Sequence, residues 1–197
     1  MTADSAEDLI QRIGAGERDA FAELYRRYRP DIFRFAAHFC GSAAPAEDIV
    51  QDVFLAVLQH ASRYRAERSA VLPWLLGIAR NHARRRRAER PMLPLPLDET
   101  HAGQELAVES DPVMDLSRDR QTALLRRALG ELPTRYREAI ILCDFHELTY
   151  LEAATALGCA VGTVRSRLHR ARAMLARRLS DVEQPFASRL PAPGAVL

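Results

Sequence analysis

Residues 148–175 read LTYLEAATALGCAVGTVRSRLHRARAML, a stretch that predicts two helices joined by a tight turn. Thr149 and Glu152 have the T-x-x-E spacing of a capping box, so a helix is expected to begin at Tyr150. Gly158 stands where that helix must stop, because glycine adopts the left-handed conformation of a helix end without strain. The stretch therefore predicts a helix-turn-helix.

The second helix of this motif, with Thr163 near its start, has two different faces. Apolar residues recur at helical spacing on one face: Val164, Leu168, Ala171, Leu175 and Leu179. Polar and basic residues point the other way: Arg165, Ser166, His169, Arg170 and Arg172. The forked guanidinium of arginine matches both phosphates and guanine edges, so this face is expected to bind DNA. The alternative is a solvated basic face on a bundle helix.

Composition favours an all-α protein with two small helical domains. The chain has 197 residues, 48% of them hydrophobic and 7% aromatic, and no strand pattern of any length. Helices are expected over about 5–13, 19–39, 42–60, 73–90, 112–130 and 133–145, before the helix-turn-helix. We expect an N-terminal domain at 1–90, a flexible acidic linker at 91–111, a C-terminal domain at 112–182, and a disordered tail at 183–197.

Charge is unevenly distributed along the chain, although the net charge is only +2. All 28 basic residues are arginine, and two clusters of them stand out, at 80–90 and at 165–178. The intervening stretch at 98–119 holds seven acids and one arginine. Two basic segments separated by an acidic one indicate a polyanion contacted at two places.

Several function classes find no support in the sequence. The three cysteines lack a C-x-x-C pair, the six histidines are scattered as expected of surface or boundary residues, and no P-loop, G-x-S-x-G or H-E-x-x-H motif occurs. We therefore expect no enzyme activity, no metal and no cofactor. The N-terminus lacks an apolar signal core and no run of residues is long enough to span a bilayer, so membrane insertion is not expected and a cytoplasmic location is.

The helix expected at 42–60 has an unusual outer side. Its inner face is apolar, whereas the outer face mixes acids and polar groups with leucines: Glu47, Asp48, Gln51, Asp52, Leu55 and Leu58. Acids can steer a basic partner helix by their charge, and leucines can bury apolar surface against it, so this face is suited to docking. The alternative is that Leu55 and Leu58 meet another helix of the same domain.

The helix expected from Pro73 carries a second mixed face. Trp74, Arg80, Asn81 and Arg84 share it, and an indole beside arginines can stack on an unpaired base while the arginines hold phosphates. Taken alone, Trp74 would more simply be a core residue. The preceding loop at 64–69 could form a pocket for a flipped base.

These segments together resemble the extracytoplasmic-function (ECF) sigma factors of bacterial RNA polymerase. AEDIVQDVFLAV at 46–57 resembles the polymerase-binding segment of that family, and the loop and helix at 64–84 resemble its downstream promoter-reading segment. LPTRYREAIIL at 132–142 and the helix-turn-helix resemble its C-terminal domain. Pro73 and a loop of alanine and arginine, instead of the commoner glycine and aspartate, depart from the family pattern.

The resemblance implies specific partners and residue roles. Core RNA polymerase would be bound by Asp48, Gln51, Asp52 and Leu55. The minus-ten element of promoter DNA would be bound by Tyr64, Arg65, Trp74, Arg80, Asn81 and Arg84. The minus-thirty-five element would be read by Thr163, Arg165, Ser166, Arg167, His169 and Arg170. An anti-sigma factor is a further implied partner, because the docking face would otherwise be permanently available.

Two other classes of protein fit part of the pattern. A free-standing helix-turn-helix regulator would bind palindromic DNA as a dimer and would not need polymerase. An adaptor acting through protein contacts alone would leave the arginine-lined helix without a role.

Overall fold

The computed structural model describes residues 4–89 and 112–183, and within them the chain is all-α without strands, as the composition predicts. The helices of the first half are α1 (Ala6–Gly14), α2 (Arg18–Cys40), α3 (Ala43–His60) and α4 (Val71–Glu89), with a short 3-10 turn η1 (Ala61–Arg63) after α3. Those of the second half are α5 (Pro112–Glu131), α6 (Thr134–Ile140), α7 (Tyr150–Leu157) and α8 (Val161–Glu183), with a π-helical turn η2 (Ile141–Phe145) after α6. The expected linker and tail fall almost entirely outside the described residues.

The first half is built around α2, which continues through Pro30. Its inner face buries Leu24 and Phe35 completely, against apolar residues of α3 and α4. The rings of Tyr25 and Phe54 lie 4.6 Å apart between α2 and α3, which adds directional aromatic packing to the apolar burial. This three-helix core fixes the outer faces of α3 and α4.

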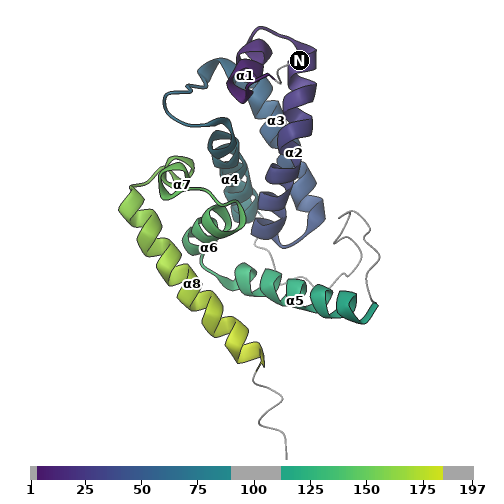
Figure 1. Cartoon of the computed structure of the whole chain (residues 1–197), viewed down its shortest axis with the longest axis vertical. Coiled ribbons are helices and arrows are strands. Elements are labelled where there is room, and N and C mark those ends of the chain that lie inside the picture. Colours follow the sequence, from purple (N-terminus) through teal and green to yellow (C-terminus); the bar gives the residue numbers. More distant parts are fainter. Residues whose placement is uncertain (1–3, 90–111, 184–197) are drawn as a thin grey trace, which may run out of the picture.

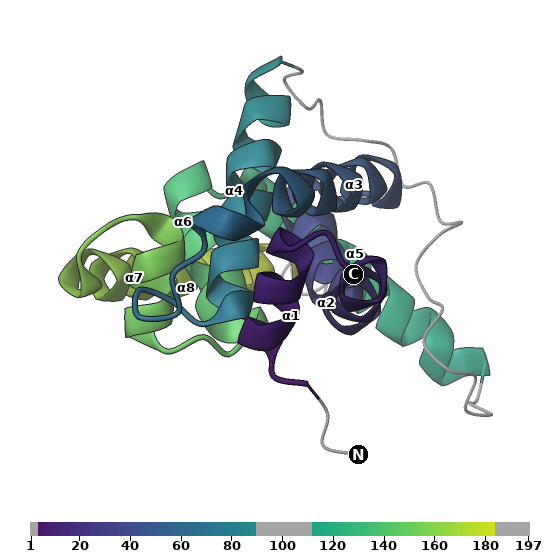
Figure 2. The ribbon, with the colours of Figure 1, turned by 90° about the horizontal axis from the view of Figure 1, so that it is seen from above.

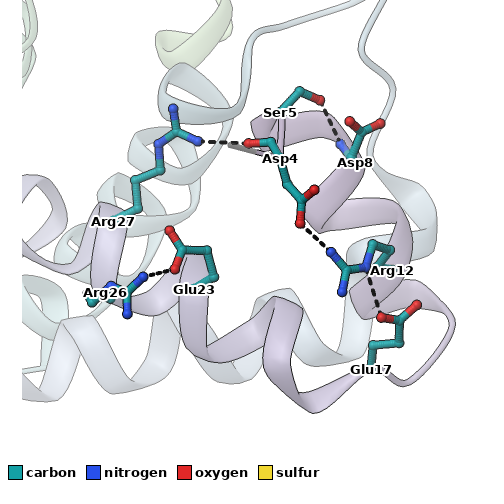
Figure 3. A network of polar contacts seen from close by, with 8 residues as sticks. All are labelled: Asp4, Ser5, Asp8, Arg12, Glu17, Glu23, Arg26 and Arg27. Atoms are coloured by element: carbon teal, nitrogen blue, oxygen red, sulfur yellow. Dashed lines mark hydrogen bonds and ion pairs between the residues drawn. The ribbon is translucent and has the colours of Figure 1, made fainter. Parts of the chain in front are cut away.

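The short helix α1 closes one end of this core and is held by polar contacts at its ends (Figure 3). The Ser5 hydroxyl accepts a hydrogen bond of 3.1 Å from the Asp8 amide, which caps the helix. Arg12, in the last turn, pairs with Asp4 and, at 2.8 Å, with Glu17. These contacts fasten α1 to the chain before and after it.

The helix expected from Pro73 begins two residues earlier, at Val71. Proline is tolerated at this position because amides in the first turn of a helix have no intrahelical partner. Leu75 and Ala79 of α4 are fully buried.

The helix-turn-helix forms as predicted. The Thr149 amide donates to the Glu152 carboxylate at 2.9 Å, and the Glu152 amide donates to the Thr149 hydroxyl at 3.3 Å, which completes the capping box. Gly158 ends α7 with a φ of 62°. Val164 and Leu168 of α8 are buried, so the basic face of that helix is turned outward.

The two halves are packed together, and α4 lies between them (Figures 1 and 2). On one side α4 contacts α2 and α3, and on the other it contacts α7. Arg137 of α6 is 1% exposed and donates a 2.9 Å hydrogen bond to the Phe39 carbonyl of α2. The C-terminal half is therefore anchored on both α2 and α4.

The expectation that every histidine lies at the surface or its boundary is wrong for His146. This residue follows η2 and is buried at the contact between the halves, with its ring 6.1 Å from that of Phe35. Burial lowers the pKa of His146 to about 3, and the nearby positive charge of Arg34 acts in the same direction. His146 is therefore neutral in the folded chain at physiological pH.

Candidate docking and nucleic-acid interfaces

The outer face of α3 presents acids and leucines together. Leu55 and Leu58 are 56% and 52% exposed, so they do not pack against another helix of the same domain. Asp48 and Gln51 are also exposed beside them, and Asp52 is half-buried. We call Asp48, Gln51, Asp52, Leu55 and Leu58 the α3 docking face.

Arg86 of α4 reaches back to the acids of this face. Its guanidinium lies 2.6 Å from the Asp48 carboxylate and 2.9 Å from that of Asp52. The two carboxylates raise the pKa of Arg86 against the opposing effect of its partial burial, so the arginine stays charged. Since Asp48 and Asp52 share one cation, their positions are fixed while Leu55 stays open to solvent.

Trp74, at the start of α4, is half-buried and packs against the core. Its ring lies 5.1 Å from the ring of Tyr64, whose hydroxyl donates a 2.8 Å hydrogen bond to the Ser69 carbonyl. Arg65 is exposed and braces the same loop by donating to the carbonyls of Ser62 and Tyr64. Tyr64 and Arg65 are thus held in a braced loop, beside Trp74 at the start of α4.

A hollow of about 420 Å³ lies between this loop and α1. Its lining includes Ile10 and Gln11 of α1 and Tyr64 and Arg65 of the loop. The hollow lies beside the loop at 64–69, and α1 forms one of its walls.

The remaining α4 residues have different surroundings. Asn81 and Arg84 are exposed, whereas the Arg80 side chain is only 12% exposed. Arg80 Nε lies 3.1 Å from a carboxylate oxygen of Glu138 in α6, and Arg84 Nε lies 3.5 Å from the other oxygen. The C-terminal half therefore covers Arg80, whereas Asn81 and Arg84 stay exposed.

The outward face of α8 keeps the expected basic surface. Arg165, Ser166, His169 and Arg170 are exposed, and Thr163 and Arg167 are half-buried. Neighbouring residues support two of the arginines. The guanidinium of Arg165 lies 5.7 Å from the centre of the Tyr150 ring. Arg170 of α8, together with Arg135, lowers the pKa of Tyr136 in α6.

Reasoning from the sequence missed Arg137 and Glu138, which join the two halves. Both are 1% exposed and lie among the buried residues Tyr136, Ala139 and Ile140. The sequence feature that could have revealed them is their position on the apolar side of a helix, where a charged residue needs a partner. The partners lie far away in the sequence, so that signal alone does not identify them.

No group of three or more His, Cys, Asp or Glu residues that could hold a metal ion occurs within 4–89 and 112–183. In the same part of the chain, no helix is long and apolar enough to cross a membrane.

Comparison with known proteins decides the family. The family models for sigma-70 region 2 and sigma-70 region 4 match residues 24–90 and 122–175. The chain is 35% identical over 179 residues to the ECF RNA polymerase sigma factor SigM of Mycobacterium tuberculosis, which covers 89% of this chain and 85% of SigM. It belongs to the ECF sigma factors of the sigma-70 family. It is an alternative sigma factor that directs transcription initiation.

Other relatives are similar to this chain over most of its length. The RNA polymerase sigma-H factor of Pseudomonas aeruginosa is 30% identical over 189 residues, covering 92% of this chain and 97% of that protein. Among solved structures, CnrH in complex with the cytosolic domain of CnrY has a TM-score of 0.66 at 26% identity, covering 90% and 99% of the two chains. RpoE in complex with the anti-sigma factor NepR, from Bartonella quintana, has a TM-score of 0.61 at 28% identity, covering 81% and 96%.

Proposed function

We propose that this sigma factor docks on core RNA polymerase through the α3 docking face and holds a promoter at two places. Residues 1–90 would form the domain for polymerase and the minus-ten element, and 112–182 the domain for the minus-thirty-five element, joined by 91–111. The chain would act in the cytoplasm by binding, with no catalytic step of its own. The single observation that carries the docking step is the exposure of Leu55 and Leu58 beside two acids.

The minus-ten element would be bound by the loop after α3 and by α4. Trp74 and Tyr64 form an aromatic pair on which a base could stack, next to a hollow large enough for one. Arg65, Arg80, Asn81 and Arg84 would supply contacts to phosphates and bases. Unstacking a base costs a few kcal/mol, which contacts in the hollow would offset.

The minus-thirty-five element would be read by α8 in the major groove. Arg165, Ser166, His169 and Arg170 are exposed on one side of that helix, as direct readout requires. Thr163 and Arg167 flank this surface. Modest affinity at each end is enough, because polymerase holds both ends on one DNA molecule.

An anti-sigma factor is the proposed regulator. CnrH and RpoE, two of the structural neighbours, are described in complex with CnrY and with an anti-sigma factor. The exposed leucines of the α3 docking face offer such a protein the same surface that polymerase would use.

Replacing Leu55 by serine tests the docking step. The variant removes apolar area from the centre of the face, so its affinity for core polymerase is expected to fall at least about tenfold. Leu151→Ser is the matched control, because Leu151 is 69% exposed on α7, outside the docking face. Affinity is measured with purified core polymerase and labelled chain. Equal losses for the two variants would contradict the assignment.

A further inference from the structure

Arg165, near the start of α8, is exposed and keeps its hydrogen-bond donors open. It makes no ion pair and no side-chain hydrogen bond with any residue of 4–89 and 112–183. Two turns further along α8, by contrast, Arg172 is bonded to the Asp144 carboxylate at 2.6 and 2.9 Å. The N–H groups of Arg165 are therefore available to a ligand, whereas those of Arg172 are occupied.

The guanidinium of Arg165 is nevertheless held by one contact, with the ring of Tyr150. Its central carbon, Cζ, lies 5.7 Å from the centre of that ring, within the range of a cation–π interaction. Such a contact uses the positive charge of the guanidinium and does not consume an N–H donor. Tyr150 therefore restricts where the guanidinium lies and leaves its donors for another partner.

Tyr150 is suited to holding another side chain, because its own backbone is fixed. It is the first residue of α7 and directly follows Thr149, whose capping box with Glu152 sets the start of that helix. Tyr150 is 39% exposed, and its hydroxyl has no hydrogen-bond partner in the part of the chain that the structure describes. The ring, and not the hydroxyl, thus makes the contact with Arg165.

The packing of the helix-turn-helix sets the distance between the two residues. α7 lies beside the first turns of α8 (Figure 1), and Ala153, Leu157 and Val164 are buried between them. A long arginine side chain on a helix surface otherwise samples several rotamers, and their loss on binding opposes affinity. A ring that orders the guanidinium beforehand lowers this cost.

We propose that Tyr150 is a positioning residue for promoter recognition, because its ring orders the Arg165 guanidinium for the base pair that this arginine reads. The proposal rests on the proposed function, in which α8 reads the minus-thirty-five element. Tyr150 acts through Arg165 and bonds to no base itself. The aromatic ring at the start of α7 is thereby part of the reading surface, although it lies outside the recognition helix.

Promoter preference of the reconstituted holoenzyme tests this role. Run-off transcription is measured on templates in which each base pair of the minus-thirty-five element is changed in turn. Arg165→Ala identifies the base pair that Arg165 reads, as the position at which discrimination is lost. At that position, Tyr150→Leu should lower discrimination about two- to fivefold, as expected for the loss of an exposed cation–π contact.

Conservative variants separate positioning from other roles of the tyrosine. Tyr150→Phe and Tyr150→Trp keep an aromatic ring, so both should retain the discrimination of the wild-type chain. An equal loss in Tyr150→Phe and Tyr150→Leu would mean that the hydroxyl acts on DNA directly, which would overturn the positioning role.

Leu151→Ala is the matched control, because Leu151 is the next residue of α7 and is 69% exposed. It should leave discrimination at the position read by Arg165 unchanged. An equal loss in Leu151→Ala and Tyr150→Leu would overturn the proposal, because any change at the start of α7 would then have the same effect.

A double-mutant cycle shows whether Tyr150 acts through Arg165. In the Arg165→Ala background, Tyr150→Leu should have no further effect on promoter preference, because the side chain to be positioned is absent. An undiminished effect in that background would overturn the proposal while leaving the proposed function intact. If Arg165→Ala changed discrimination at no position, the assignment of α8 in the proposed function would itself be wrong.

Discussion

Single polar residues decide how the two halves meet. His146 sits against Phe35 without a hydrogen-bond partner on either ring nitrogen among the described residues. Such a ring tolerates burial only when neutral, which is why its pKa falls to about 3. His38 lies nearby, beside Phe145, and burial and the charges of Arg126 and Arg34 lower its pKa to about 4.

The sign of the resulting pH dependence follows from these values. An unfolded histidine has a pKa of about 6.5, above that of folded His146, so acid favours the unfolded chain. The contribution of neutral His146 to the free energy of unfolding is fully present above pH 6.5 and is lost progressively as the pH falls toward 3. At pH 5 the loss due to His146 is about 2 kcal/mol, at about 1.4 kcal/mol per pH unit.

Denaturation by urea at pH 7.5 and pH 5 measures this effect. His146→Phe should show a smaller loss of unfolding free energy on acidification than the wild-type chain. His169→Phe should keep the full loss, because His169 is exposed on α8. An unchanged pH dependence in His146→Phe would show that His146 does not titrate on unfolding.

At the scale of elements, local rules accounted for the helix-turn-helix. The Thr149–Glu152 capping box, the turn at Gly158 and the buried Val164 all follow from spacing within a few residues. The start of α4 was less predictable, since proline suits several positions in a first turn. The exposure of Leu55 could not be decided, because an apolar residue on an outer face is equally consistent with a neighbouring helix.

The basic face of α8 makes a prediction about promoter recognition. Arg165→Ala is expected to weaken use of a promoter with a minus-thirty-five element by about 1–3 kcal/mol, which is about fivefold to 150-fold, because one base or phosphate contact is lost. Affinity for core polymerase should not change. Both quantities are measured with the reconstituted holoenzyme.

The control for this prediction is Arg127→Ala, an equally large change of charge on α5, where the side chain is 73% exposed. It should leave promoter use close to that of the wild-type chain. A loss of polymerase affinity in Arg165→Ala, with promoter preference retained, would mean that α8 presents a protein-binding surface.

At the scale of the whole molecule, the sequence predicted the all-α class and the candidate surfaces but not how the halves meet. Glu138 and Arg80 are 58 positions apart, and no local pattern links them. The pair lies one turn of α4 from Gly77, which is close to Ala156 of α7. The members of the α3 docking face, by contrast, could be grouped from the sequence because all lie on one helix, although their exposure could not be decided.

The central claim is that the chain gives core polymerase its promoter choice. Run-off transcription on genomic fragments, with and without the chain, tests this most directly when start sites are mapped. We predict new, defined start sites only when the chain is present, preceded by a shared two-part sequence at constant spacing. Identical transcripts with and without the chain would contradict the account.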